Sequence, residues 1–328
     1  MYRKLFVIVM LVSIMIVPLA AQDDGNVVAD GLLSPRNMSF DSDGNLYVAE
    51  AGVAGGQTSA DDNPFGASSR ISVIAADGTH SVAVHGLISY REGNSLGATA
   101  VQATDESIWI LLNETADFSI PFTHALVELD KETGRVKTFV DLLTIELEED
   151  PDGNANKQSN ATDFAIADDG TFYIANAGCN CLMTWSEDDG LAVYHVWDYE
   201  MDNPVPTTVE IGPDGDLYVG FLTGFPFPQG SARVERWSGG ELVETFGGLT
   251  AVTGLLVTHD QTIYAVEFGV FDQGWAPGRV VMVTADGPVP VLEGLQNPYG
   301  IAQSHDGTIV VSTGSGSIIS LPMMGMDG

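Results

Sequence analysis

The chain has 328 residues, of which 45 are acidic and 12 are basic, so its formal net charge is −33. A field of this sign repels nucleic-acid phosphates, which excludes a nucleic-acid-binding protein, while it is compatible with a well-solvated surface or with cation binding. The length allows one large core, and no linker or low-complexity tract divides the chain into domains.

The first 21 residues have the pattern of a secretory signal peptide. Arg3 and Lys4 precede an apolar run over residues 5–17, and Ala20 and Ala21 follow it, either of which suits the cleavage site. The run is short for a membrane span. We predict a signal peptide over residues 1–21 and one domain over residues 22–328, secreted or periplasmic, with no membrane insertion after cleavage.

One short phrase then returns six times, as in FDSDGNLYVAE from Phe40 and IGPDGDLYVGF from Ile211. Each copy has a tight acidic turn, often Asp-Gly, followed by an aliphatic and aromatic strand, which is the chemistry of a β-hairpin. The Asp residues that mark the turns are Asp43, Asp105, Asp169, Asp214, Asp260 and Asp306. Because the last three intervals between them are 45, 46 and 46 residues, the period indicates blades or coils.

A second strand pair follows most hairpins, as in ISVIAADGTHSVAV from Ile71, so each unit has the four strands of a propeller blade. The last unit ends near Leu321 without a fourth strand, whereas VVADGL at Val27 matches the fourth-strand endings of other units. We therefore predict an all-β, six-bladed β-propeller whose N-terminal strand closes the last blade. A solenoid, the alternative for such a repeat, would need polar capping units.

Hairpin geometry predicts which face binds. The start of each inner strand and the end of its neighbour lie on one face, and the long connections leave from that face, over residues 51–69, 88–96, 113–123, 147–160, 222–231 and 268–278. Counting from the marker Asp residues predicts two rings of residues there. The strand-opening ring is Asn37, Thr99, Asp163, Thr208, Gly254 and Gly300, and the strand-closing ring is Glu50, Leu112, Asn176, Phe221, Glu267 and Thr313.

The polar members of these rings are the candidate ligand-binding residues. Asn37 and Asp163 would stand at the channel mouth, with Glu50, Asn176 and Glu267 just outside them. Carboxylates and amides around a channel suit a hard cation or a sugar-like ligand. Asp and Asn at strand ends are equally typical of local hydrogen bonds to the backbone.

Two long connections carry further candidates. The first has acids and amides at alternate positions around a glycine and resembles half of a calcium loop, although it lacks the distant bidentate Glu; its possible ligands are Asp150, Asp152, Asn154 and Asn156. Ca²⁺ or another divalent cation is therefore a possible cofactor. The second contains Phe225 and Phe227 between prolines, which suits a rigid platform for a flat or apolar ligand or a cover over the fourth blade.

The two cysteines, Cys179 and Cys181, are one residue apart. They are predicted to be packed thiols or a labile disulfide, because no further Cys is present to complete a soft-metal site.

The mature chain resembles the ScyD/ScyE family of exported propellers. The resemblance is carried by SPRNMSFDSDGNLYVAEAG, VPTTVEIGPDGDLYVGFLTGFPFPQGSARVERW and QNPYGIAQSHDGTIVVS, and LTGFPFPQGSARV is its most specific part. It implies a propeller fold and an exported protein, in a family without a settled biochemical activity. The wider NHL and gluconolactonase-like propellers share only the repeated phrase.

Resemblance to the enzymatic propellers gives two further tests. Gluconolactonase-like propellers bind metal one position before the strand-opening ring, and Arg36, Ala98, Thr162, Thr207, Thr253 and Tyr299 at those positions are poor divalent-metal ligands. Streptogramin-lyase-like propellers use histidines on the ligand face, where His124 alone is expected here.

These observations predict a monomeric, exported protein that binds a small polar or metal-bearing ligand, or a partner protein, on its loop-rich acidic face. The alternative is a lyase or hydrolase of the streptogramin-lyase or lactonase-like type. It would use Asp163 or Glu267 as general base and a bound divalent cation to polarise the substrate. A binding protein is favoured, because the chain has no Ser-His-Asp order, phosphate loop or zinc spacing.

Overall fold

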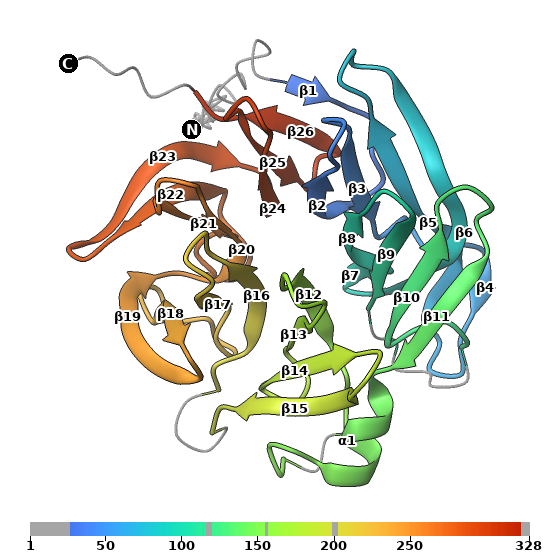
Figure 1. Cartoon of the computed structure of the whole chain (residues 1–328), viewed down its shortest axis with the longest axis horizontal. Helices are drawn as coiled ribbons and strands as arrows, with labels where there is room; N and C mark the ends of the chain where they lie inside the picture. Colours follow the sequence, from blue (N-terminus) through green and yellow to red (C-terminus); the bar gives the residue numbers. More distant parts are fainter. Residues whose placement is uncertain (1–26, 114, 116–119, 155–156, 199–202, 323–328) are drawn as a thin grey trace, which may run out of the picture.

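The computed structural model is a ring of six antiparallel β-sheets around a central axis, and it describes residues 27–113, 115, 120–154, 157–198 and 203–322. Figure 1 looks down this axis and shows one inner strand of each sheet beside the centre, from β2 through β8, β12, β16 and β20 to β24. The prediction of an all-β, six-bladed propeller is confirmed.

The blades follow one another along the chain. The first contains β2 (Pro35–Phe40), β3 (Leu46–Glu50), β5 (Pro64–Ile74), β6 (His80–Glu92) and β7 (Asn94–Leu96), with β4 (Gln57–Thr58) beside β5. The second contains β8 (Ala98–Ala103), β9 (Ser107–Leu112), β10 (Ala125–Asp130) and β11 (Val136–Asp141). The third contains β12 (Ala161–Ile166), β13 (Phe172–Asn176), β14 (Cys181–Ser186) and β15 (Gly190–Val196).

The remaining three blades have the same order. The fourth contains β16 (Pro206–Ile211), β17 (Leu217–Phe221), β18 (Ala232–Ser238) and β19 (Glu241–Leu249). The fifth contains β20 (Val252–Val257), β21 (Ile263–Glu267), β22 (Gly278–Thr284) and β23 (Gly287–Leu295). The sixth contains β24 (Pro298–Gln303), β25 (Ile309–Thr313), β26 (Ser317–Ser320) and β1 (Val27–Ala29).

The N-terminal strand closes the ring as predicted. β1 pairs antiparallel with β26, with Val27 opposite Ile319, and the two strands lie side by side in Figure 1. The regular strand ends at Ala29, but the Leu32 amide still donates to the Gly316 carbonyl at 3.0 Å and the Leu32 side chain is buried. Closure therefore gives β26 a hydrogen-bonded neighbour on an edge that would otherwise be unpaired.

The turns of the inner hairpins owe their shape to the repeated Asp-Gly chemistry. In the third blade, Asp169 Oδ1 accepts the Thr171 amide at 3.0 Å, and Gly170 has a φ of 86°. This hydrogen bond lowers the pKa of Asp169. A side chain with a Cβ is strained at such a φ, which is why glycine is repeated at this position.

Apolar side chains fill the spaces between blades. Between the second and third, Trp109 packs on Phe172 with ring centroids 4.5 Å apart, and Trp185 joins them. Because large aromatic rings bury the most apolar area, such clusters hold neighbouring blades in fixed positions.

Two segments predicted as loops are regular. β6 continues to Glu92 and turns into β7, so residues 88–96 form a hairpin, and α1 (Leu143–Glu149) occupies the start of the connection before the third blade. Figure 1 shows α1 at the rim, outside β14 and β15. Residues 1–26 lie outside the described residues, so the signal peptide, the export of the chain and the first residues of the domain stay predictions. Among the described residues, no helix is long and apolar enough to cross a membrane.

Candidate functional site

Strand register at the loop-bearing face differs from the prediction by a β-bulge. Glu50, Asn176 and Glu267 pair with Pro35, Ala161 and Val252, which are two residues earlier in the inner strands than expected. In each hairpin the register then shifts, so that one inner-strand residue has no direct partner. Such an extra residue re-aims the side chains beside it.

This shift moves the channel-mouth positions by one residue. A cavity of about 390 Å³ lies at the mouth, and every inner strand contributes one residue to it. In five blades this residue is the one just before the predicted strand-opening position, and in the second blade it is the predicted residue Thr99. These residues are Arg36, Thr99, Thr162, Thr207, Thr253 and Tyr299. Thr99 was itself predicted as strand-opening, but Ala100 is the residue of the second blade that corresponds to Asp163.

The second strands contribute residues one position after the predicted strand-closing ring. These are Ala51, Asn113, Ala177, Leu222 and Phe268. We call the whole cavity, with these two sets of residues, the mouth pocket. Of the residues that the structure describes, no Asp or Glu lines it.

The threonines of the mouth pocket join neighbouring blades. Thr162 Oγ1 donates to the Thr207 carbonyl at 2.8 Å, and Thr207 Oγ1 donates to the Val252 carbonyl at 2.7 Å. Thr99 and Thr253 make the equivalent hydrogen bonds to the next blade at 3.2 Å. Because their hydroxyl protons are committed to the backbone, these residues are poorly placed to donate to a ligand.

Glu50, Asn176 and Glu267 lie inside the blades instead of beside the pocket. They are 0 %, 0 % and 2 % exposed. Glu50 accepts hydrogen bonds from the Leu33 amide, Ser72 and Arg70. Their burial, rather than the exposure expected at a ligand site, indicates a structural role.

The other two residues have equivalent partners. Glu267 Oε1 accepts the Thr250 amide at 2.7 Å, while Oε2 pairs with Arg279. Asn176 Oδ1 accepts the Asn160 amide at 2.9 Å. In all three blades, therefore, this position caps the segment that leads into the inner strand.

Asn37 and Asp163 lie beside the central channel, beyond the lining of the mouth pocket. Asn37 is 8 % exposed, and its Nδ2 donates to the Thr162 carbonyl at 3.2 Å. Asp163 Oδ2 accepts Thr208 Oγ1 at 2.7 Å and the Val209 amide at 3.2 Å. These contacts bind the first, third and fourth blades together around the axis.

A second carboxyl, Glu210, lies near Asp163, and sequence reasoning did not single it out. Burial raises the pKa of Asp163 to about 7, although its hydrogen bonds from Thr208 and Val209 act in the opposite direction. Burial, together with the nearby charge of Asp163, raises the pKa of Glu210 to about 8. Both side chains are partly buried, and the surrounding protein disfavours their charged forms.

Arg36 supplies the positive charge of the mouth pocket. Its guanidinium carbon lies 4.4 Å from the centre of the Tyr299 ring, and its Nη2 donates to the Ser95 carbonyl at 2.6 Å. Burial lowers the pKa of Arg36, opposed by the electrostatic influence of Tyr299. An arginine remains charged despite such a shift, so the pocket contains a cation.

Aromatic side chains form one wall of the mouth pocket. Phe227, Phe268 and Trp275 line it, with Phe227 and Phe268 4.9 and 4.8 Å from Trp275 between ring centroids. Phe225 lies on the same loop but is 76 % exposed and does not line the pocket. The sequence left this loop as either a platform for a ligand or a cover over the fourth blade, and the structure adds its aromatic partners from the fifth blade.

The predicted calcium loop folds on itself in the described part of the chain. Asp152 Oδ2 accepts Asn154 Nδ2 at 2.7 Å and Asn180 Nδ2 at 3.0 Å, while Asn156 lies outside the described residues. Burial first, and then the charges of Asp152 and Asp150, raise the pKa of Glu146 to about 7. Among the described residues, no group of three His, Cys, Asp or Glu side chains is placed to hold a metal ion.

Cys179 and Cys181 are joined by a disulfide and are both buried. Of the two states that the sequence allowed, packed thiols or a disulfide, the structure has the disulfide.

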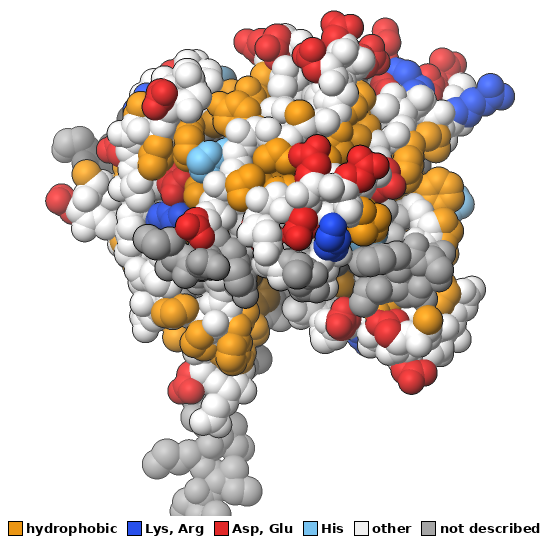
Figure 2. Space-filling view, turned by 90° about the horizontal axis from the view of Figure 1, so that it is seen from below, with side chains coloured by type: hydrophobic (Ala, Val, Ile, Leu, Met, Phe, Trp, Pro, Cys, Tyr) orange, Lys and Arg blue, Asp and Glu red, His pale blue; other side chains and the backbone are white. Residues whose placement is uncertain are grey.

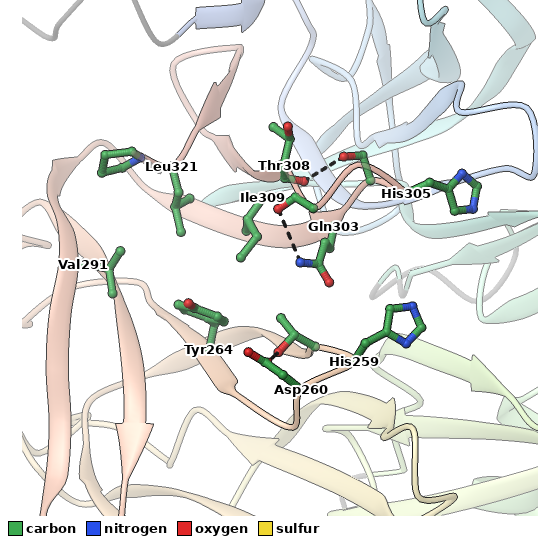
Figure 3. A pocket seen from close by; sticks show the side chains of 13 residues that line it. His259, Asp260, Tyr264, Val291, Gln303, His305, Thr308, Ile309 and Leu321 are labelled. Carbon is green, nitrogen blue, oxygen red and sulfur yellow. Dashed lines mark hydrogen bonds between the residues drawn. The ribbon is translucent and has the colours of Figure 1, made fainter. Parts of the chain in front are cut away.

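Another cavity, of about 470 Å³, lies between the fifth and sixth blades on the face with the tight turns. Figure 3 shows His259 and His305 toward one end of it and Val291 and Leu321 toward the other. Both histidines are exposed, and Asp260 and Ser304 make hydrogen bonds within their own turns. This cavity is larger, but it lacks the buried charge and the aromatic wall of the mouth pocket.

The fold is shared with enzymes and binding proteins. A streptogramin B lyase structure superposes with a TM-score of 0.54 at 13 % identity, covering 90 % of this chain and 95 % of that one. A putative gluconolactonase gives 0.55 at 13 % identity, covering 90 % of each chain. The calcium-binding protein regucalcin from Agrobacterium tumefaciens gives 0.55 at 10 % identity, covering 90 % of this chain and 94 % of that one.

The chain is a six-bladed propeller similar to those of the streptogramin lyase and gluconolactonase type. No protein-family model matches it, and no curated protein matches it in sequence. The resemblance to the ScyD/ScyE family therefore stays a prediction. At these identities the likeness concerns the fold alone, so function must be argued from the site.

Proposed function

We propose that this protein binds a small organic molecule with a flat, apolar part in the mouth pocket. The observation that carries the proposal is the cavity of about 390 Å³ to which all six inner strands contribute and which Phe227, Phe268 and Trp275 wall on one side. A concave pocket with aromatic walls and few polar groups is the usual form of a small-molecule site. The predicted signal peptide implies that binding takes place outside the cytoplasm.

The site differs from the acidic cation site that the sequence suggested. Glu50, Asn176 and Glu267 are committed to the backbone of their own blades, and no carboxylate of the described residues lines the mouth pocket. A neutral or anionic ligand therefore suits the pocket better than a metal ion.

The experiment uses 2-naphthamide, a flat and neutral probe, and follows the indole N–H resonance of Trp275, assigned with a Trp275→Phe variant. We expect this resonance to shift on titration. We expect Phe227→Ala to weaken binding about tenfold, as expected for the loss of a stacked aromatic contact.

Phe225→Ala is the matched control, because it removes the same side chain from the same loop outside the pocket. It should leave the affinity within about twofold. An unshifted Trp275 resonance, or equal losses in the two variants, would contradict binding in the mouth pocket.

A second candidate function is the predicted lyase or hydrolase, and one observation favours it. Asp163 directly follows the pocket residue Thr162, and burial raises its pKa to about 7, a suitable value for a general base at neutral pH. Glu267 is less suitable because Arg279 and the Thr250 amide occupy its oxygens. Turnover of an ester or lactone probe that is lost in Asp163→Asn, in a variant that still binds 2-naphthamide, would support this candidate.

A further inference from the structure

The mouth pocket has a charge opposite to that of the rest of the molecule. The chain has 45 acidic and 12 basic residues, and Figure 2 shows acidic side chains outnumbering basic ones on the side of the disc that it views. Among the described residues, the pocket lining contains Arg36 and no Asp or Glu residue. In this part of the chain, the pocket is therefore a place where an anion meets a cation without an adjacent carboxylate.

Arg36 also differs from four other partly buried arginines. Arg70, Arg236 and Arg279 each pair with a carboxylate, with Nε of Arg70 2.8 Å from Glu50 Oε1. Arg233 likewise pairs with Glu235 at 2.7 Å. In the described part of the chain, no carboxylate lies within ion-pair distance of Arg36, although carboxylates are abundant.

The contacts of Arg36 leave most of its hydrogen-bonding capacity unused. A guanidinium has five N–H donors, and within the described chain Arg36 donates to the Ser95 carbonyl. The Tyr299 ring lies against it at 4.4 Å and fixes its position. Tyr299 and Ser95 also line the pocket, so the guanidinium is oriented by the walls of the cavity that a ligand would enter.

A latch between the sixth blade and the β6–β7 hairpin would need the hydrogen bond to Ser95 and the contact with Tyr299. Such a structural contact would not need a positive charge that is partly removed from water and has no counterion, which is unfavourable. A carboxylate on a ligand would provide that counterion and could accept two parallel N–H donors from the guanidinium.

We propose that Arg36 is the anion-binding residue of the mouth pocket and that the ligands of this protein are flat aromatic or conjugated carboxylic acids. The proposal rests on the proposed function and adds the chemical class of the ligand. The aromatic wall of Phe227, Phe268 and Trp275 holds the flat part, and Arg36, beside Tyr299, holds the acid group.

The test compares 2-naphthoate with 2-naphthamide, which have the same shape and differ in charge. For the wild-type protein at pH 7.5 we expect 2-naphthoate to bind at least about tenfold more tightly, since hydrogen bonds to a charged group are stronger than neutral ones. Calorimetry gives the two affinities, and the Trp275 indole resonance shows that both probes occupy the pocket.

Two variants assign the preference to Arg36. Arg36→Gln should bring the two affinities to within about twofold of each other. Arg91→Gln is the matched control, because it removes the same charge from an exposed side chain outside the pocket lining and should keep the preference.

The outcomes separate this proposal from the proposed function. Equal affinities of the two probes in the wild type, both with a shift of Trp275, would overturn the anion proposal and keep the binding site. A preference that survives in Arg36→Gln would also overturn it. If Arg36→Gln does not fold, Arg36→Lys replaces it in the test. Lys keeps the charge but loses the paired donors, so the preference for 2-naphthoate over 2-naphthamide should be smaller than in the wild type but still measurable.

Discussion

Glu267 is a side chain whose partners define its role. It accepts the Thr250 amide at 2.7 Å and pairs with Arg279 while being 2 % exposed. We expect Glu267→Gln to lower the free energy of unfolding by about 1–3 kcal/mol, because a charge-assisted hydrogen bond in a buried position is weakened. Urea denaturation measures the loss, and the affinity for 2-naphthoate should stay within twofold. Unchanged stability combined with weaker binding would instead show that Glu267 belongs to the ligand site.

The raised pKa values of Asp163 and Glu210 predict that the free energy of unfolding falls as the pH rises. Their folded pKa values of about 7 and about 8 lie above the ordinary values of 3.8 and 4.5, so the folded state holds protons that the unfolded state has released. Their contribution to stability is therefore fully present below about pH 4 and is lost as the pH rises through 7 to 8.

We expect the double variant Asp163→Asn/Glu210→Gln to match the wild type at pH 3.5, below both unfolded pKa values, and to be more stable at pH 8.5, by several kcal/mol, about 4 or more. Denaturant midpoints at the two pH values measure the difference. The general negative charge of the protein affects both proteins alike, so it cancels in the comparison. Parallel losses in the wild type and the variant would show that this pair does not titrate as described.

At the scale of elements, β1 carries the closure of the ring. It pairs with β26, and Leu32, just after it, is 5 % exposed. We expect deletion of residues 27–32 to cost several kcal/mol, about 3 or more, from lost strand pairing and apolar burial. The change should appear as a large drop in Tm or as aggregation. A chain that begins at Val27 is the control, and its Tm should equal that of the mature protein. An unaltered Tm after the deletion would contradict closure by β1.

The connection around α1 gives a test of the calcium prediction. Glu146 is 1 % exposed, and its Oε1 and Asp150 Oδ1 are buried without hydrogen-bond partners among the described residues. Among the described residues no group of three acidic or histidine side chains is placed to hold a metal ion, but Ca²⁺ also takes carbonyl and water oxygens, so it could satisfy these two atoms. We therefore expect 5 mM Ca²⁺ to raise Tm by about 3 °C or more at pH 8, and we expect Glu146→Gln to remove that rise. A background of 0.3 M NaCl screens the general charge. Equal responses of the wild type and the variant to Ca²⁺ would show that Glu146 does not bind calcium.

The elements were predictable because the repeat fixes them. The Asp-Gly turns and the alternation after them specify each hairpin, and the unpaired last unit together with VVADGL specifies the closure. Most residues that line the mouth pocket lie one position away from the predicted ones, because a β-bulge in the inner strand cannot be recognised from residue type. Thr162 and Asp163 look alike as strand-opening residues, and the paired residues of β12 and β13 reveal the shift. The sequence marks Arg36 only as a poor metal ligand, whereas the proposed anion-binding role follows from its place in the pocket and from the absence of a carboxylate partner in the described chain.

At the scale of the whole molecule, the net charge of −33 acts against the ligand that Arg36 selects. An anion approaching the protein meets a repulsive field over a distance that salt shortens to about 10 Å at 0.1 M. The contact with Arg36 forms at short range in a partly enclosed pocket, where screening is weaker. Approach and retention should therefore respond differently to salt.

We expect the association rate constant of 2-naphthoate to rise about threefold or more between 20 and 300 mM NaCl, because screening removes long-range repulsion. Its dissociation rate constant should change by less than about twofold, and neither rate constant should depend on salt for the neutral 2-naphthamide. Stopped-flow fluorescence with both probes measures all four quantities, and Arg36→Gln should release 2-naphthoate faster at every salt concentration. An association rate that falls with salt would show that the acid is attracted from a distance, which contradicts a cationic pocket inside a strongly negative protein.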